Sequence, residues 1–282
     1  MLDSVRADLH IHTIASDGTW TPQQLVEQVV ATGIGLFSVT DHDTVRSVPA
    51  AAALATQKGV RFLSGVEVSA KLDGRLMHVL AYGLDPADRC LVPFLAENET
   101  RLREYDDVTV QMLLDAGYRI DLDAYRQYTW DRTRGGWKAL NFFIDQGFCR
   151  DVASFFGELF AGPLTLSFPA FPPVEEVICA IQGAGAVPVW AHPGESLRDQ
   201  SASQANEALA RMVRAGLQGI ECYSCHHGHV WTRRCLAWAQ SCDLLVTGGS
   251  DSHGSFAGRQ LGHPSIVLSD LRLGPLADLI SS

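Results

Sequence analysis

Short apolar runs alternate with amphipathic stretches along most of this chain, and no other feature constrains the fold as strongly. Strands are predicted over 5–13, 34–44, 60–70, 75–84, 186–194, 217–224 and 243–254, and helices over 21–33, 49–59, 173–185, 206–216 and 230–242. In the first helix, Thr21 is suited to the N-cap, Pro22 to the first turn and Gly33 to the end. Right-handed crossovers join such β–α units into a parallel sheet or a barrel.

The alternation stops between residues 89 and 170, where the segments read as helices with no clear strand. It resumes at residue 171 and continues almost to the end of the chain. The sequence therefore predicts a barrel domain made of 1–88 and 171–282. The helical insertion domain over 89–170 is expected to contribute to the substrate pocket.

Composition limits the kinds of partner. Apolar residues make up 46% of the 282 residues and charged residues 19%, so a large core can form. The net charge of −10 argues against long nucleic acid or an anionic membrane surface as the main partner, because both attract basic patches. It does not exclude a small phosphorylated substrate, since bound metal ions can make a site locally cationic.

The location expected from the sequence is the cytoplasm. The first residues lack the basic flank and apolar stretch of a signal peptide, and no apolar run reaches the ~18 residues of a spanning helix. Seven cysteines form no disulfide framework, which suits a reducing compartment. The oligomeric state is not predicted.

Polar side chains at or near the predicted strands are mostly of metal-ligand type. They are His10, His12, His42, Glu67, His78, His192, Glu221, Asp251 and His253. In α/β barrels the carboxyl ends of the strands surround one mouth, so residues far apart in the sequence can converge there.

The residue types favour a metal site over isolated polar side chains. His10 and His12 lie one residue apart, about 6 to 7 Å at the backbone of a strand, which lets both imidazoles reach one ion. Alternatively, these two histidines do not bind a metal, and their side chains face solvent or are satisfied by hydrogen bonds. Glu67 and His78 stand in apolar runs, where each needs an ion or a hydrogen-bond partner. Mixed imidazole and carboxylate ligands suit Zn²⁺, Mn²⁺ or Fe²⁺.

A series of motifs in order carries a family resemblance. They are "DLHIHTIASDG", "TDHDT", "GVEVS", "MHVL", "AHPG", "GIECYSCHHG" and "GSDSHG". Over about 6–84 and 172–265 the chain resembles the polymerase and histidinol phosphatase (PHP) family, in its stand-alone phosphoesterase branch. The resemblance implies an α/β fold, a distorted (β/α)7 barrel with a mostly helical insertion.

The resemblance also implies a trinuclear centre of divalent Mn, Fe or Zn ions. A first metal would be held by His10, His12 and Asp251, and Glu67 would bridge it to a second metal that His78 and His192 also bind. A third metal would be held by Asp17, His42 and His253. Asp17 comes from the resemblance alone, because "SDG" is otherwise an ordinary turn.

The implied chemistry is attack on a phosphate ester by a hydroxide that bridges two metals. Glu67 and Asp251 would take part as ligands, and His227, six residues after Glu221, would contact the phosphate or protonate the leaving group. Either His226 or His229 could face the site in its place. A separate zinc knuckle built on Cys222 and Cys225 is a weaker alternative, because no second cysteine pair accompanies them.

The expected substrate-binding residues are Arg134 and Lys138, besides His227. Family members often carry an Arg-Pro-His segment in the insertion, whereas this chain has Arg-Gly-Gly-Trp over 134–137. Trp130 and Trp137 could stack on a base, or form part of the core. This departure leaves the substrate more open than the reaction.

The sequence predicts a metal-dependent phosphoesterase acting on a small phosphorylated metabolite, resembling a nucleotide mono- or bisphosphate. A cyclic phosphodiesterase or a short-oligonucleotide exonuclease on the same site is the alternative. The second alternative is a metal-binding regulatory domain without catalytic activity. It is disfavoured because all nine predicted ligand positions carry residues that can bind a metal. Metal-dependent hydrolysis of a C–N bond on a similar barrel is a further possibility, but it usually needs a bridging lysine at a strand end in the middle of the barrel. No lysine is suitably placed, since the nearest, Lys71, lies beyond Glu67.

Overall fold

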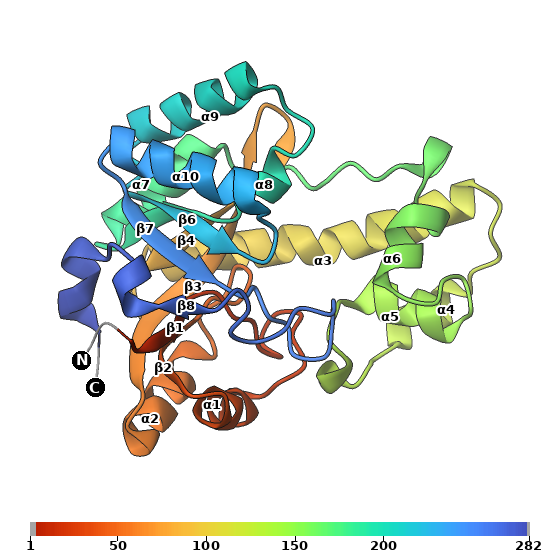
Figure 1. The fold of residues 1–282 in the computed structure, drawn as a ribbon. Coiled ribbons are helices and arrows are strands. Elements are labelled where there is room, and N and C mark those ends of the chain that lie inside the picture. Colours follow the sequence, from red (N-terminus) through yellow and green to blue (C-terminus); the bar gives the residue numbers. More distant parts are fainter. Residues whose placement is uncertain (1–3, 281–282) are drawn as a thin grey trace.

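The computed structural model describes residues 4–280, and a single curved sheet dominates it (Figure 1). Its strands are β1 (Arg6–Asp8), β2 (Ile34–Val39), β3 (Arg61–Leu72), β4 (Arg75–Tyr82), β5 (Val187–Trp190), β6 (Gly219–Ser224), β7 (Leu245–Gly249) and β8 (Ile266–Val267). They follow the order β7-β6-β5-β4-β3-β2-β1-β8. The sheet nearly closes, because Leu9 N donates to Gly248 O at 3.1 Å and Ile11 pairs with Ser252. The predicted α/β barrel is confirmed.

The sheet departs from the parallel arrangement at β4. This strand runs antiparallel to both β3 and β5, because a tight Asp73–Gly74 turn joins it to β3. Both turn residues have positive φ, 52° and 77°, as two-residue hairpins with Asp-Gly require. As a result His78 lies in the first half of β4, opposite Ser69, and reaches the same mouth as Glu67.

Helices cover the outside of the barrel. They are α1 (Pro22–Ala31), α2 (Val48–Lys58), α7 (Val174–Gly183), α8 (Pro193–Ser196), α9 (Ala202–Arg214) and α10 (His229–Ser241). The predicted start of α1 is confirmed, since Thr21 and Gln24 form a capping box and Pro22 opens the helix. The helix is capped at Thr32, with Gly33 following at a φ of 71°.

One apolar cluster lies between the strands and the helices, and a second lies inside the barrel. The second is built from strand residues and is closed by the C-terminal 3-10 helix Gly274–Leu279. Ala7 and Leu9 belong to it, whereas Ile11 packs in the cluster between strands and helices. The strand predicted over 5–13 would place Ala7, Leu9 and Ile11 on one face, and the structure separates Ile11 from the other two. Regular β1 ends at Asp8, and beyond it the chain is held by separate bonds, such as that from Thr40 N to Ile11 O at 2.8 Å.

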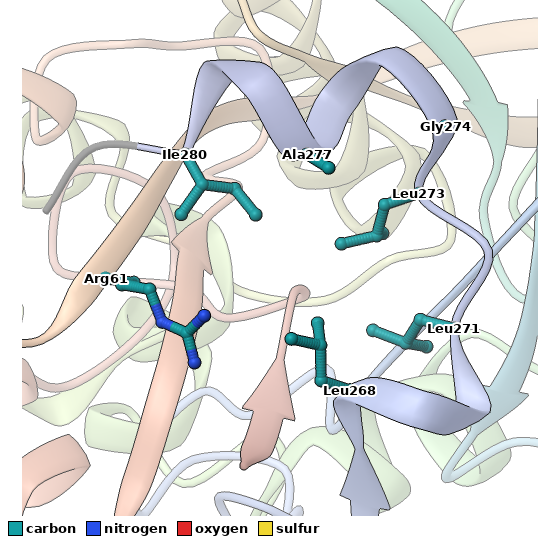
Figure 2. A pocket seen from close by; sticks show the side chains of 7 residues that line it. All are labelled: Arg61, Leu268, Leu271, Leu273, Gly274, Ala277 and Ile280. Carbon is teal, nitrogen blue, oxygen red and sulfur yellow. The ribbon is translucent and has the colours of Figure 1, made fainter. Parts of the chain in front are cut away.

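A cavity of about 410 Å³ lies at the barrel end where β3 begins (Figure 2). Arg61, the first residue of β3, lines it together with apolar residues of the C-terminal segment such as Leu273 and Ile280. None of its lining residues is among the predicted site residues. The predicted site residue of β3, Glu67, lies further along the strand than Arg61.

The insertion forms helical structure with an apolar cluster of its own, which includes Leu113, Phe143 and Phe155. Its elements are α3 (Leu91–Asp115), α4 (Leu122–Gln127), a 3-10 helix (Arg132–Arg134), α5 (Lys138–Asp145), α6 (Val152–Ser154), a π-helical turn (Phe155–Leu159) and a 3-10 helix (Gly162–Leu164). The long helix α3 extends from the barrel into it (Figure 1). Within residues 4–280, no helix is long and apolar enough to cross a membrane.

Candidate metal centre

All nine predicted metal ligands gather at one mouth of the barrel. Three groups have ligand atoms within 4.8 Å of one another. The first group is His10, His12, Glu67 and Asp251; the second is His42, Glu67 and His78; the third is His12, Asp17, His42 and His253. His192 joins the second group, because its Nε2 lies 2.8 Å from Glu67 Oε1.

The first group joins the chain segments after β1 and β7 to Glu67, which lies within β3. His10 Nε2 lies 3.2 Å and His12 Nε2 3.3 Å from Glu67 Oε2, and the same nitrogens lie 3.4 and 3.0 Å from Asp251 Oδ1. All four residues are buried, the most exposed being Asp251 at 2%. Two imidazole nitrogens and two carboxylate oxygens thus surround one small space.

Glu67 divides its two oxygens between groups. Oε2 faces His10, His12 and, at 3.2 Å, His42 Nδ1. Oε1 faces His192, and His78 Nδ1 at 3.3 Å. A carboxylate placed in this way between two sets of imidazoles is suited to bridge two ions.

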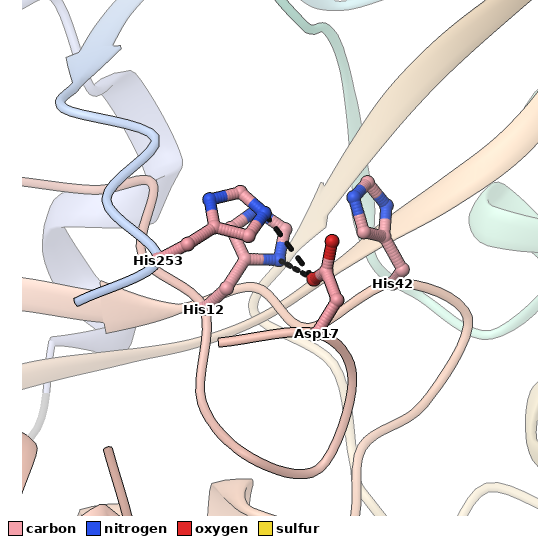
Figure 3. A group of neighbouring side chains, drawn as sticks. All are labelled: His12, Asp17, His42 and His253. Atoms are coloured by element: carbon pink, nitrogen blue, oxygen red, sulfur yellow. Dashed lines mark ion pairs between the residues drawn. The ribbon is translucent and has the colours of Figure 1, made fainter. Parts of the chain in front are cut away.

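The third group shares His12 with the first. Figure 3 shows its four side chains, His12, Asp17, His42 and His253. Asp17 Oδ1 lies 3.2 Å from His253 Nε2 and 3.8 Å from His12 Nδ1. His12 thus directs one ring nitrogen to each group. Asp17, which could only be inferred by resemblance, is brought to the other ligands by the tertiary structure.

The side chains of the site affect one another's charge. Burial alone would raise the pKa of Glu67, but the surrounding histidines, first of them His10, hold that pKa well below its ordinary value. Burial lowers the pKa of His78 to about 3. The pKa of His12 is raised to about 9 despite burial, because the carboxylates of Asp251 and Glu67 lie beside its ring and favour the charged form.

Several buried polar atoms of the site have no hydrogen-bond partner. They are His10 Nε2, His12 Nε2, Asp17 Oδ1, Glu67 Oε2, His192 Nδ1 and Asp251 Oδ1. An unpaired polar atom in the interior costs free energy, and buried charges are usually paired or bound to metals. These are nitrogen and oxygen donors of the types that Zn²⁺, Mn²⁺ and Fe²⁺ accept. The residues therefore fit divalent ions.

Other residues orient the ligands. Glu221 Oε1 lies 3.0 Å from His10 Nδ1, which leaves His10 Nε2 for the first group, and Oε2 accepts the backbone N–H of His192 at 2.8 Å. His192 and Asp251 both have positive φ, 26° and 50°, a conformation that costs energy and is common at functional sites. The position of Glu221 at a strand end was the only sequence signal for this orienting role.

Two aspartates near the ligands in sequence hold the backbone instead. Asp8 accepts N–H groups of Ser250 at 2.9 Å and Gly262 at 2.8 Å, joining β1 to the segment after β7. Asp41 accepts from Thr13 N at 2.7 Å and from the Ser16 hydroxyl at 2.8 Å. Both therefore fix the loops that carry ligands.

His226, which the sequence left as an alternative, reaches the cluster. Its Nε2 lies 2.8 Å from Asp251 Oδ2 and its Nδ1 3.3 Å from Glu195. His227 instead has both ring nitrogens engaged with backbone, Nδ1 with Cys222 O and Nε2 with Gly194 N, each at 3.0 Å. His226 thus contacts the ligand cluster, whereas both ring nitrogens of His227 are engaged with backbone atoms.

The two cations expected to bind substrate have partners within the insertion. Arg134 forms two bonds to Asp145, at 2.8 and 2.9 Å, and Lys138 donates to Arg126 O at 3.2 Å and lies over the Tyr125 ring. The cation in direct contact with the ligand groups is Arg259, which donates to Asp251 Oδ2. No sequence motif indicated Arg259.

The structure gives little support to a stacking role for Trp137 or to a zinc knuckle at Cys222 and Cys225. Trp137 packs at right angles to Phe155 in the insertion's apolar cluster, as expected of a core residue. Cys222 is fully buried, and the groups that could hold a metal within residues 4–280 include Cys225 only with His226 and Asp251. The separate zinc knuckle is therefore not formed by Cys222 and Cys225.

Comparisons with known proteins agree with the site. The family model described as PHP domain matches residues 8–151. The chain is 30% identical to a 3',5'-nucleoside bisphosphate phosphatase of Chromobacterium violaceum, over 91% of this chain and 90% of the relative. It is 27% identical to a phosphoribosyl 1,2-cyclic phosphate 1,2-diphosphodiesterase of Eggerthella lenta, over 88% and 94%. The 5'-3' exoribonuclease Rnm of Escherichia coli is 26% identical, over 87% and 84%.

Solved structures share the fold. An amidohydrolase from Chromobacterium violaceum superposes with a TM-score of 0.81 and 27% identity, over 98% of this chain and 97% of the other. A putative metal-dependent phosphoesterase from Bifidobacterium adolescentis gives 0.77 and 29%, over 91% of each chain.

The barrel, its mouth of imidazoles and carboxylates and these relatives define a metal-dependent phosphoesterase. The chain belongs to the PHP domain family. It is therefore a phosphoric ester hydrolase, and the non-catalytic alternative is set aside.

Proposed function

We propose that this phosphoesterase hydrolyses a small phosphorylated metabolite, resembling a nucleotide mono- or bisphosphate, and that three divalent ions serve the reaction. The observation that carries the proposal is the arrangement of Glu67, whose two oxygens face two sets of histidines. The bisphosphate phosphatase with 30% identity supports the substrate class.

We assign the ions to the three groups as follows. His10, His12 and Asp251 would hold one ion and His78 and His192 a second, with Glu67 placed between the two. Asp17, His42 and His253 would hold the third. Divalent ions in such sites supply a nucleophile at neutral pH, by lowering the pKa of water, and neutralise phosphoryl oxygens. Manganese, iron and zinc all fit these donors.

The chain's own residues would bind and orient the phosphate. Arg259 stands against Asp251 with 26% of its side chain exposed, so its guanidinium is placed to donate hydrogen bonds to a phosphate oxygen beside the first group. His226 contacts the same oxygen, Asp251 Oδ2, at 2.8 Å, and is placed to donate a proton to a leaving oxygen. We propose Arg259 and His226 for these roles ahead of Arg134, Lys138 and His227.

A cyclic phosphodiester is the second candidate substrate. The Arg-Gly-Gly-Trp segment departs from the family pattern, and a relative with 27% identity is named as a cyclic phosphodiesterase. A short oligonucleotide is the next candidate, since another relative is an exoribonuclease, while the net charge of −10 disfavours long strands.

A cytoplasmic location also stays a prediction, resting on the odd number of cysteines.

A substrate panel tests the proposal. The protein is reconstituted with Mn²⁺ or Zn²⁺ and incubated with nucleoside 5'-monophosphates, 3',5'-bisphosphates, cyclic phosphates and short oligonucleotides. Phosphate release should be fastest from a mono- or bisphosphate. Faster opening of a cyclic phosphate would favour the second candidate, and no turnover of any member would contradict the proposal.

A further inference from the structure

The loop that carries Asp17 is held largely by the insertion. The carbonyls of four consecutive residues, 14–17, each accept a hydrogen bond from a distant residue. Arg132 donates to the carbonyls of residue 14 at 3.1 Å and residue 16 at 2.6 Å. Arg46 donates to that of residue 15 at 2.7 Å, and Gly136 N to that of Asp17 at 2.8 Å.

Two of these donors belong to the insertion, and the third is oriented by it. Arg132 lies in the 3-10 helix before α5 and Gly136 just after that helix. Arg46 pairs with Glu99 of α3 at 2.8 Å. Arg132 also lies over the Trp130 ring, 4.8 Å from its centre, which restricts the guanidinium.

The glycines in this segment are required by the close contact. Gly135 has a φ of 73° and a ψ of −175°, a region that is essentially restricted to glycine. A Cβ at Gly135 would lie 2.8 Å from Asp17 O and 2.7 Å from the Cβ of Phe256. The insertion backbone therefore packs directly against the Asp17 loop.

The insertion also contacts residues next to His42 and His253, two other members of the third group. Asn98 of α3 donates to Asp43 Oδ1 and to Ser69 O, both at 2.9 Å, which fixes the residue after His42 at a φ of 49°. Phe256, which pairs with His253, lies against Gly136 and Trp137. By contrast, His10 and Asp251 of the first group are held by Glu221, His226 and Arg259.

We propose that the helical insertion forms the third metal group, with Arg132 and Gly136 as positioning residues for Asp17. The inference rests on the metal centre of the proposed function. The physical reason is that Asp17 lies in an irregular loop, where no regular strand pairing sets the direction of its carboxylate. Three hydrogen bonds from the insertion and a fourth from Arg46 replace the support that a strand would give.

The test counts bound metal in matched arginine variants. Wild type, Arg132→Ala and Arg134→Ala are reconstituted with Mn²⁺, and bound ions are measured by elemental analysis and by titration. Arg134 is the control, because it lies in the same 3-10 helix but its guanidinium pairs with Asp145 of the insertion and not with the Asp17 loop. We expect three equivalents in the wild type and in Arg134→Ala. In Arg132→Ala one equivalent should bind about 10- to 100-fold more weakly, as for other supports of metal ligands.

Two further comparisons separate positioning from loss of stability. Asp17→Ala should lose the same equivalent, and adding Arg132→Ala to it should cause no further loss. Gly135→Ala should also lose that equivalent, whereas Gly147→Ala should keep it, because Gly147 shares the positive φ but has nothing within 4 Å of an added Cβ. Circular dichroism checks that each variant is folded.

The inference is overturned if Arg132→Ala keeps three tight equivalents, if Arg134→Ala loses metal equally, or if the wild type binds only two. Failure of the proposed function gives a different result. A wild type that binds three ions but releases no phosphate from the substrate panel contradicts the reaction and leaves the role of the insertion intact.

Discussion

At the scale of single residues, the site depends on which atoms of a side chain face which ligand group. His12 directs Nε2 to the first group and Nδ1 to the third, and Glu67 directs one oxygen to each of two sets of histidines. The sequence indicates which residue types are present. It does not indicate that one residue serves two groups, since this depends on the orientation of rings placed by different strands.

Glu67→Gln should reduce both metal binding and activity. An amide keeps the size but replaces one acceptor oxygen with a donor, which cannot bind a cation and faces imidazole nitrogens. We expect at least one equivalent to be lost and phosphate release to fall more than about 100-fold. Elemental analysis and a phosphate assay measure these effects. Glu175→Gln, which alters an exposed pair with Arg211, is the control, and equal loss in both would refute the assignment.

His226 and His227 should differ in what their substitution changes. His226→Gln should lower kcat with little change in thermal stability, because its ring contacts Asp251 at the site. His227→Ala should lower the free energy of unfolding by about 1 to 3 kcal/mol, because Cys222 O and Gly194 N lose their partner. Steady-state kinetics and denaturant unfolding measure the two effects. Lost kcat in a stable His227 variant would support the original assignment instead.

At the scale of elements, buried polar side chains join the insertion helices to one another. Asp106 of α3 accepts backbone N–H groups of Lys138 and Ala139, at the start of α5. The N-cap residue of α5, Trp137, has no side-chain bond to that helix end. Asp106 therefore supplies the capping that the local sequence lacks, which periodicity cannot reveal.

The stability of the protein should fall with rising pH through Asp106. Burial raises the pKa of this carboxyl to about 7, above an unfolded value of about 3.9. Between these values the unfolded chain gives up the proton more readily, so ionisation favours unfolding as pH rises from about 4 to 7. The lost stability is on the order of 4 kcal/mol at most, from ~1.4 kcal/mol per unit.

Unfolding of wild type and Asp106→Asn at pH 5 and pH 8 measures this effect. The decrease between the two pH values should be smaller in Asp106→Asn. Asp115→Asn, on an exposed position of the same helix, should behave as the wild type does. An equal decrease in all three proteins would show that Asp106 does not carry the effect.

At the scale of the whole molecule, the ligand groups form a buried and incompletely paired interior. The unpaired atoms of His10, His12, Glu67 and Asp251 lie where the strand ends converge. Their desolvation cost is carried by the folded state alone, so ions that bind there should stabilise the fold.

Removal of metal should therefore lower the Tm. A chelator should destabilise the protein, and Mn²⁺ or Zn²⁺ at about 100 times its Kd should restore roughly 2.7 kcal/mol per site. Differential scanning calorimetry with and without metal measures the shift. Glu67→Gln should show a smaller shift, and an unchanged Tm in the wild type would count against a buried multinuclear site.

The sequence alone determined the fold class and the ligand types. Local periodicity places strands and helices, and the caps of α1 at Thr21 and Pro22 are set by neighbouring residues. Ordered motifs named the nine candidate ligands, since such motifs need only residue type and spacing. The barrel was confirmed, and the nine residues lie together, while their roles as ligands stay a prediction.

Only the tertiary structure decided direction and partnership. It reversed β4 through the turn at Asp73, moved Ile11 to the outer cluster, paired Arg134 with Asp145 and brought Arg259 and His226 to Asp251. Each of these depends on contacts between residues distant in sequence, which local patterns do not encode. The same holds for Asp17, whose loop is held by an insertion that begins about 70 residues later.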